Sequence, residues 1–211
     1  DYKTNFNLAD ELQVLGCAVL DHQLARLSEQ PEIDRIVVVA PKEYQKKYTL
    51  DKPLSYCSCN AESDADISLI KDLVRDEPFF VLLGNFITEL PFSLLKSEFI
   101  AKRSDLCFLY GDKDNRQDGY FVKLDKSHKL RDFKYNSGNY LSVFQNIFLI
   151  SPELLEYLVP GENYNFYEKF LPEMLRRNKF INGLKNKHEH FALTDPASWY
   201  RANYALLRAN K

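Results

Sequence analysis

Residues 79–90 are Phe-Phe-Val-Leu-Leu-Gly-Asn-Phe-Ile-Thr-Glu-Leu, in which five consecutive apolar residues are followed by a glycine and an asparagine. A run this short, rich in aromatic and branched residues, is typical of a strand that is buried on both faces. In open α/β sheets, ligands bind in the crevice outside the carboxyl ends of such strands. The sequence therefore predicts that Gly84 and Asn85 lie at the floor of any pocket. The alternative is that Gly-Asn forms only a turn.

Three other apolar runs predict strands that share this sheet, at residues 36–40, 106–110 and 147–150. Helices are predicted between them from apolar spacing and start signals, at 19–28, 43–48, 66–75, 92–102, 165–177 and 196–210, with another beginning at 151. A short strand at 54–57 and a hairpin over 120–124 and 129–133 complete the pattern. We therefore expect one domain over residues 1–211, an α/β three-layer α/β/α Rossmann-like fold with a mixed, mainly parallel sheet.

The composition is that of an ordinary globular protein, with 45% apolar and 27% charged residues and a net charge of −2. This charge gives no overall electrostatic attraction to nucleic acid or to a membrane. No apolar run is long enough to span a bilayer, and no signal peptide opens the chain. The four cysteines are expected to be reduced thiols. These features predict a cytoplasmic protein that binds neither membrane nor nucleic acid directly.

Two short motifs contain residues that could bind a metal ion. Cys57-Ser-Cys59 has one intervening residue, which is too few for the usual zinc knuckle. His188-Glu-His190 could place two ligands on one face of a strand, but no third ligand is near in the sequence. We therefore predict no metal site from these motifs.

Five stretches of the chain resemble the sugar-phosphate nucleotidyltransferases in sequence, order and spacing. They are GCAVLDHQLARL at 16–27, the strand 33–40, the Gly-Asn-Phe-Ile-Thr turn at 84–88, Asn-Ile-Phe-Leu-Ile-Ser-Pro at 146–152, and Thr-Asp-Pro-Ala-Ser-Trp-Tyr-Arg-Ala-Asn at 194–203. The resemblance implies a nucleotidyltransferase fold, and an enzyme that joins a nucleoside triphosphate to a sugar phosphate with Mg²⁺. It adds Lys134, Asn146 and Asp195 to Gly84 and Asn85 as pocket candidates.

Three departures from the family put its chemistry in question. The family begins with a strand and a Gly-rich loop that holds phosphates through backbone N–H groups, whereas this chain has no glycine before Gly16. The metal-binding Asp after the central strand is replaced by the neutral Asn85. The second metal-binding Asp aligns near Ala192. Mg²⁺ sites usually contain one or two carboxylates, so no metal ligand can be assigned.

Two hypotheses about function follow from the resemblance. The first is a catalytically degenerate domain that serves as a binding or assembly module with protein partners. It is similar to the gamma and epsilon subunits of the guanine-nucleotide exchange factor of translation initiation, through the 76–95 stretch and the 199–203 ending. The alternative is an active sugar-1-phosphate nucleotidyltransferase whose Gly-rich loop lies outside this chain. A nucleotide or sugar nucleotide is a possible ligand in both, and Mg²⁺ is expected only in the second.

Overall fold

The computed structural model describes residues 12–42, 48–59, 66–74, 76–84, 86–113, 119–159 and 162–209. Its α-helices are α1 (Val19–Ser28), α2 (Phe92–Lys102), α3 (Leu171–Arg176) and α4 (Pro196–Ala209). Its strands are β1 (Gln13–Val14), β2 (Cys17–Ala18), β3 (Ile36–Ala40), β4 (Leu54–Ser58), β5 (Phe79–Leu82), β6 (Phe86–Thr88), β7 (Leu106–Asp112), β8 (Tyr120–Leu124), β9 (Leu130–Tyr135), β10 (Ser142–Ile150), β11 (Ile181–Lys185) and β12 (His190–Ala192). None of the described helices has the length and apolar character that crossing a bilayer needs.

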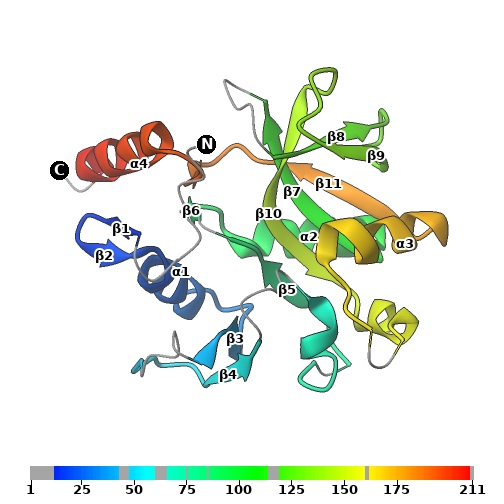
Figure 1. Cartoon of the computed structure of the whole chain (residues 1–211), viewed down its shortest axis with the longest axis horizontal. Coiled ribbons are helices and arrows are strands. Elements are labelled where there is room, and N and C mark those ends of the chain that lie inside the picture. The colour runs from blue at the N-terminus through cyan, green and yellow to red at the C-terminus, as the bar shows by residue number, and fades with distance from the viewer. Residues whose placement is uncertain are drawn as a thin grey trace.

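A six-stranded mixed sheet forms the centre of the fold, as Figure 1 shows. Strand β10 runs antiparallel to β7 on one edge and antiparallel to β5 and β8 on the other. Strand β11 joins β7 in parallel, and β9 joins β8 as a hairpin. Because β10 opposes both β5 and β7, those two strands and β11 point in the same direction. The α/β class and the mixed central sheet predicted from the sequence are confirmed.

Helices cover both faces of this sheet. On one face, Leu171 and Met174 of α3 pack in a cluster with Phe108 and Phe148. On the other face, the clustered side chains come from α1, α2 and the opposite sides of the same strands, and they include Leu24, Phe92, Leu95, Leu109 and Leu149. Alternate residues of a strand point to opposite faces, which is why neighbouring residues such as Phe148 and Leu149 belong to different clusters.

The expectation that residues 36–40 and 79–83 share one sheet is wrong for the described residues. Strand β3 pairs in parallel with β4 as a separate two-stranded sheet, whereas β5 pairs with β10. No described strand lies between β3 and β5 to join the two sheets. The two strands still share the α1-side apolar cluster, through Ile36 and Phe80 among others. Their apolar sequence predicts the strands, but β5 is half-buried rather than buried, Val39 of β3 is 39% exposed, and the sequence does not report which strand lies alongside.

Several predicted helices are shorter or of another type than expected. The 66–75 segment forms only a 3₁₀ turn (Ile67–Ile70), which the Asp66 carboxylate caps by accepting the Ser68 N–H, and Pro152–Tyr157 is likewise a 3₁₀ turn. The 165–177 segment begins as a π-helical turn (Phe166–Phe170) before α3. The predicted helix at 43–48 lies, apart from Tyr48, outside the described residues.

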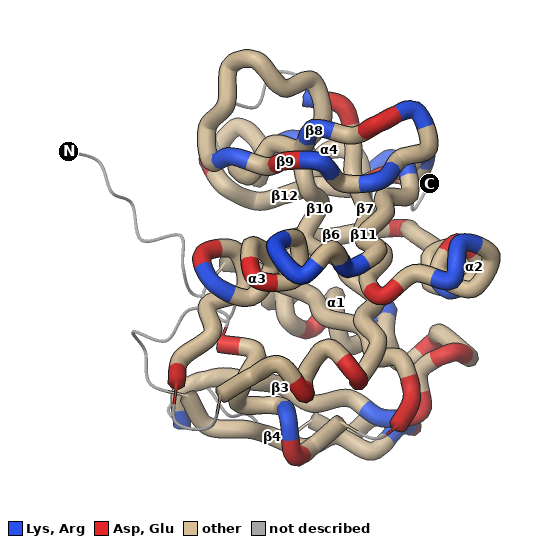
Figure 2. The backbone as a smooth tube through the Cα atoms, turned by 90° about the vertical axis from the view of Figure 1, so that its right-hand side faces the viewer, with Lys and Arg blue, Asp and Glu red and all other residues tan. Residues whose placement is uncertain are grey.

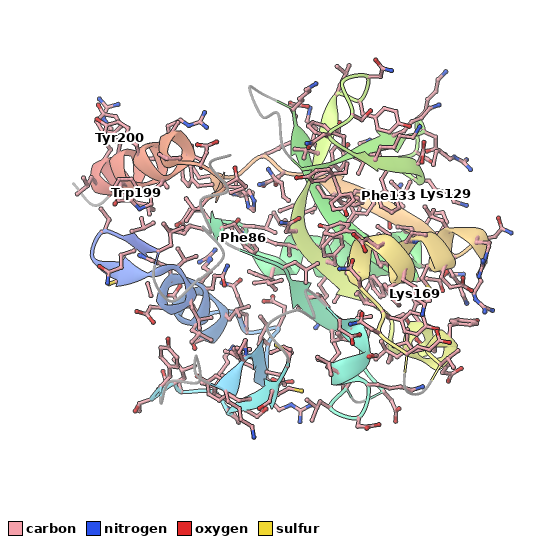
Figure 3. The ribbon with its side chains drawn as sticks, in the orientation of Figure 1. Phe86, Lys129, Phe133, Lys169, Trp199 and Tyr200 are labelled. Carbon is pink, nitrogen blue, oxygen red and sulfur yellow. The ribbon has the colours of Figure 1, made fainter. Side chains whose placement is uncertain are left out.

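Each of the helices α2 and α4 buries only one face. Ile100 of α2 is 62% exposed, because α2 buries only the face that carries Phe92, Leu95 and Phe99. In α4, Leu206 packs inward, whereas Tyr200 and Leu207 are exposed. Figure 3 shows Trp199 on the side of α4 that faces β1 and Tyr200 on the opposite side, and the Trp199 Nε1–H donates to the Gln13 carbonyl.

Candidate functional site

The carboxyl end of β5 turns sharply at Gly84, which has a φ of +81°. Glycine adopts this conformation without the strain that a Cβ would add, so the strand ends at a residue that has no side chain of its own. The Leu83 N–H still donates to the Asn146 carbonyl at 3.0 Å. On the other side, Gln23 of α1 donates through Nε2 to the carbonyl oxygens of Gly84 and Phe86, both at 3.1 Å. These bonds fix the backbone on both sides of residue 85.

Asn146 lies at a fork in the central sheet. The same edge of β10 pairs with β8 at Ser142 and Val143 and with β5 from Ile147 onward. Between these two ladders, the β10 register is irregular and Asn146 has a φ of +59°. Asparagine tolerates this left-handed conformation better than most residues. The fork opens at the carboxyl end of β5, which is where the sequence predicted a pocket.

The Asn146 side chain is held in one orientation by a tyrosine. The Tyr167 hydroxyl donates to Asn146 Oδ1 at 2.5 Å. With Oδ1 occupied, Asn146 Nδ2 lies on the Gly84 side, 3.8 Å from the position that a Cβ at Gly84 would take. The fork thus presents an amide donor beside an open glycine. Gly84 and Asn146, two of the residues predicted from sequence, are brought together.

Aromatic rings form one wall of the fork. The Tyr120 ring stacks on Tyr167, with centroids 4.1 Å apart and an interplanar angle of 12°, and Tyr135 packs against Tyr120. Burial raises the pKa of the Tyr167 hydroxyl well above its ordinary value, and burial followed by the Glu168 charge raises the pKa of Tyr120. Both hydroxyls therefore remain protonated donors at neutral pH. The sequence pattern did not indicate these tyrosines, because 165–177 has the spacing of an ordinary helix.

The other predicted site residues have different positions. Asn85 lies outside the described residues. Lys134 is exposed in β9, paired with Phe121, and β8 and β10 separate its strand from β5. Asp195 accepts the Ser198 N–H at 2.6 Å and so caps the start of α4. Its carboxylate has a structural role there.

Ala192 lies opposite Phe86 in the two-stranded β6–β12 sheet. The position near which the family resemblance places a second metal-binding carboxylate therefore carries a methyl group, across the ladder from Phe86. The Phe86 ring stacks on His190 at 5.1 Å, in the middle of the molecule (Figure 3). Within the described ranges, no three His, Cys, Asp or Glu side chains gather to hold a metal ion.

A hollow of about 320 Å³ lies on the α1 side of Phe86. Gln23, Arg26, Thr88 and Leu206 are among the residues that line it, whereas Gly84 and Asn146 are not. The Arg26 guanidinium in this hollow donates to the carbonyl oxygens of Glu89 and Leu90. The hollow is thus separate from the fork, and its guanidinium is engaged by the backbone.

Known structures share this architecture over nearly the whole chain. A Bacillus anthracis protein described as a glucose-1-phosphate thymidylyltransferase, solved with sucrose, matches with a TM-score of 0.79 at 16% identity, over 99% of this chain and 90% of its own. HddC from Yersinia pseudotuberculosis matches with a TM-score of 0.75 at 15% identity, over 94% and 89%. The inositol-1-phosphate CTP transferase from T. maritima matches with a TM-score of 0.69 at 14% identity, over 96% and 86%.

The fold is that of the sugar-phosphate nucleotidyltransferases. No protein-family model and no curated protein sequence matches the chain. The nucleotidyltransferase fold implied by the sequence resemblance is confirmed, and identities of this size establish the fold alone.

Proposed function

We propose that this protein is a nucleotidyltransferase that joins a nucleoside triphosphate to a sugar phosphate and releases pyrophosphate. The supporting observation is the fork, where an oriented amide and an open glycine lie at the carboxyl end of β5. The solved neighbours named above include a thymidylyltransferase and a CTP transferase. In this proposal the Asn146 Nδ2 donates to a hydroxyl of the sugar or to the base, and the Gly84 backbone allows the ligand to approach.

The described residues do not fit the Mg²⁺ site that the family resemblance implies. The Ala192 side chain offers no oxygen, residue 85 is a neutral asparagine, and the described residues contain no group of three His, Cys, Asp or Glu side chains that could hold a metal ion. Mg²⁺ would neutralise the charge that develops during transfer, but we assign no step to it here. The phosphate-binding loop is also lacking from residues 1–15, which contain no glycine. The proposed enzyme would therefore hold the phosphates with groups other than a glycine-rich loop within residues 1–15.

A binding or assembly module is the second candidate function. It is favoured by the neutral residues at the two positions where the family resemblance places carboxylates, Asn85 and Ala192. Such a module would hold a nucleotide or sugar nucleotide at the fork without turning it over. An assembly role like that of the exchange-factor subunits of translation initiation, with protein partners, belongs to this candidate and is not singled out by the structural neighbours.

Pyrophosphate release separates the two candidates. The natural protein, with whatever residues precede Asp1 in it, is assayed with each of the four common nucleoside triphosphates and a panel of sugar phosphates. Turnover above the blank supports the enzyme. Binding of a nucleoside diphosphate sugar without turnover supports the module. Residues 1–211 alone are expected to release no pyrophosphate, and turnover by them would show that the loop is not required from outside.

Variants at the fork test whether the ligand is bound there. Asn146→Gly keeps the left-handed backbone and removes the amide, so ligand affinity should fall about tenfold, the effect of one lost hydrogen bond. Asn178→Gly makes the same change at another left-handed asparagine, after α3, and should leave affinity unchanged. Asn85→Asp should raise Mg²⁺ affinity if residue 85 faces the site. Equal losses in both glycine variants would remove the fork from the proposal.

A further inference from the structure

Helix α4 carries a row of exposed apolar side chains beside the face that packs on the molecule. The packed face includes Ala202 and Leu206, which lie in a cluster with side chains of β1 and β6. Tyr200, Tyr204 and Leu207 are outside that cluster and are 65%, 49% and 55% exposed. Figure 3 shows Tyr200 pointing away from the rest of the molecule. Single exposed apolar residues are common, whereas a row of them on one element indicates a contact surface.

The residues of this row have the spacing of a helix–helix seam. Tyr200, Tyr204 and Leu207 follow one another at intervals of four and three residues, as the d, a and d positions of a heptad do. The two tyrosine rings are nearly parallel, with an interplanar angle of 11° and centroids 6.4 Å apart. The Arg208 guanidinium lies 4.9 Å from the centre of the Tyr204 ring. Tyr200, Tyr204 and Leu207 thus form one strip along the helix, which we call the α4 strip.

Both arginines of α4 lie on one flank of the α4 strip. Arg201 and Arg208 are seven residues apart, so both occupy e positions of the same heptad pattern. Both are exposed, and neither forms an ion pair within the part of the chain that the structure describes. Residues 196–211 contain no Asp or Glu that could neutralise them. This flank is therefore positive, and e positions are where charge selects the partner of a packed helix.

The opposite flank of the α4 strip carries no charge. Asn203, at the g position, accepts the Leu15 N–H through Oδ1 at 2.9 Å. Its Nδ2 donates to the Trp199 carbonyl, also at 2.9 Å. The Asn203 side chain is thus engaged by the molecule itself and offers no ion pair. Over the described residues of α4, the charge preference of the strip therefore depends on Arg201 and Arg208.

A second copy of α4 does not match this arrangement. In an antiparallel pair of α4 helices, the e positions face each other, so arginine would face arginine. In a parallel pair, e faces g, so arginine would face the neutral Asn203. Neither pairing gains an ion pair, and the first is opposed by like charges. A helix with Glu or Asp beside its apolar seam, by contrast, gains an ion pair at both Arg201 and Arg208.

We propose that the α4 strip binds one amphipathic helix of a partner protein, whose apolar seam is flanked by Glu or Asp residues. The tyrosines and Leu207 supply the apolar anchors, at the spacing by which helices recognise one another. Arg201 and Arg208 select the acidic partner and speed its association. The strip is short, so the interface stays below the roughly 1,200 Å² of a stable complex, and the complex is a reversible one. The inference does not depend on the proposed activity.

Two synthetic helices test the chemistry of the partner. The acidic probe is three repeats of Glu-Leu-Ala-Ala-Leu-Glu-Lys, and the basic probe is three repeats of Lys-Leu-Ala-Ala-Leu-Lys-Glu, which has the same leucine seam. In NMR titrations of the chain at low salt, the acidic probe should shift the amide signals of residues 200–208. Its affinity should exceed that of the basic probe at least about fivefold, since ion pairs replace like-charge contacts, and added salt should reduce this preference. Equal affinity for both probes, no binding, or shifts confined to other residues would overturn the proposal.

Charge reversal in the chain tests the role of the arginines. Arg201→Glu combined with Arg208→Glu should exchange the preference, so that the basic probe binds at least about fivefold more tightly than the acidic one. Both positions are exposed, so the double variant should keep the urea midpoint of the natural chain. Lys102→Glu, at the exposed end of α2, is the matched control and should leave both affinities unchanged. An unchanged preference in the double variant would contradict the assignment of the arginines.

An apolar anchor is tested in the same way. Tyr204→Gln should weaken binding of the acidic probe about tenfold, the effect of losing one aromatic anchor. Ile100→Gln, at an exposed apolar residue of α2, is the matched control and should leave this affinity unchanged. Equal losses in the two variants would show that the probe does not bind at the α4 strip. Sedimentation at several concentrations checks for self-association. Dimers of the natural chain that Tyr204→Gln abolishes would identify a second copy as the occupant and overturn the partner assignment.

Discussion

Strand β3 and residues 147–150 of β10 are both continuous apolar runs, but in the part of the chain that the structure describes only β10 has a neighbour along each edge. Phe148 of β10 is fully buried, with 0% of its surface exposed, whereas Val39 of β3 is 39% exposed. The β-branched run of β3 is as apolar as residues 147–150 of β10. The comparison shows that an apolar sequence indicates whether the faces of a strand are covered, because the faces bury side chains. It does not indicate whether the edges are paired, because the edges bury only backbone.

The strands at the edges of the two sheets, β9 and β3, also differ in the number of charged residues that they carry. Figure 2 shows acidic and basic residues interspersed over the face it presents, with Lys and Arg prominent on β9, while the tube through β10 is almost without charge. Strand β9 is an edge strand and carries Arg131 and Lys134, which suits an edge that must not pair with other chains. Strand β3 has no charged residue of its own. Among the described residues, the edge of β3 away from β4 therefore lacks the charges that the β9 edge carries.

The largest expected effect is at the centre of β10. Phe148→Ala should lower the free energy of unfolding by about 3–5 kcal/mol, because a fully buried ring is replaced by a cavity. Its ring lies 4.4 Å from that of Phe166, centroid to centroid, so both lose contacts. Urea denaturation measures the loss. Val37→Ala on β3 is the matched control and should cost no more than about 1 kcal/mol. Similar losses in the two variants would mean that β3 is as central as β10.

A smaller loss of stability is expected on β5, between the losses expected for Phe148→Ala and Val37→Ala. Phe80 is half-buried, and its ring packs edge-on against Phe92 with centroids 5.0 Å apart. Phe80→Ala should cost about 2 kcal/mol, less than a fully buried phenylalanine. The comparison is made by urea midpoints at constant m-value. If Phe80→Ala costs as much as Phe148→Ala, the Phe80 ring is as deeply buried in solution as that of Phe148, and the expected difference between the two strands is absent.

Much of the fold could be predicted from the sequence, because its signals are local. Apolar runs marked β3, β5, β7 and β10, and apolar spacing marked α1 and α2 to within a residue. Strand pairing is not a local property, since it depends on which segments lie alongside each other in the fold. Neither the β3 nor the β5 sequence indicates that the two strands are separated. Helix type in 66–75 was missed because Asp66 favours a short capped turn that apolar spacing cannot distinguish from a helix.

The sequence singled out part of the candidate site for the same reason. Gly84 was chosen because a glycine after an apolar strand is a local signal, and the structure places Asn146 beside it. Tyr167 was missed because its contact with Asn146 joins residues 21 apart in the chain. Asp195 was assigned to the pocket, although the same Asp-Pro motif is sufficient to explain it as the cap of α4. When a local motif already explains why a residue is present, as helix capping explains Asp195, that residue is weak evidence for a further role in a binding site.

Tyr167→Phe tests the hydrogen bond that orients Asn146. The variant should lower stability by about 1 kcal/mol, the usual contribution of one hydrogen bond, since the ring remains in place. Ligand affinity should fall as well, because the amide becomes free to rotate. Tyr200→Phe on the exposed face of α4 is the control and should change neither quantity. Unchanged affinity in Tyr167→Phe would mean that the amide orientation does not matter to the ligand.

The smallest effect is expected at the turn of the β8–β9 hairpin, which is the edge furthest from β3. Hydrogen bonds from the Ser127 hydroxyl, and then from the Lys129 and Ser127 N–H groups and the Arg131 guanidinium, hold the pKa of the Asp125 carboxyl well below its ordinary value of 3.8. A depressed pKa means that the charged form stabilises the fold above pH 3.8, and that this contribution is lost as the pH falls below 3.8 toward the folded value. Asp125→Asn should therefore be less stable than the natural chain at neutral pH, and the difference should shrink as the pH is lowered through this window.

Ser127→Ala removes the largest of these bonds and should raise the Asp125 pKa, measured by NMR titration of its carboxyl. A gap between the natural chain and Asp125→Asn that is constant down to the lowest accessible pH would show that the turn is held by its backbone rather than by the carboxylate.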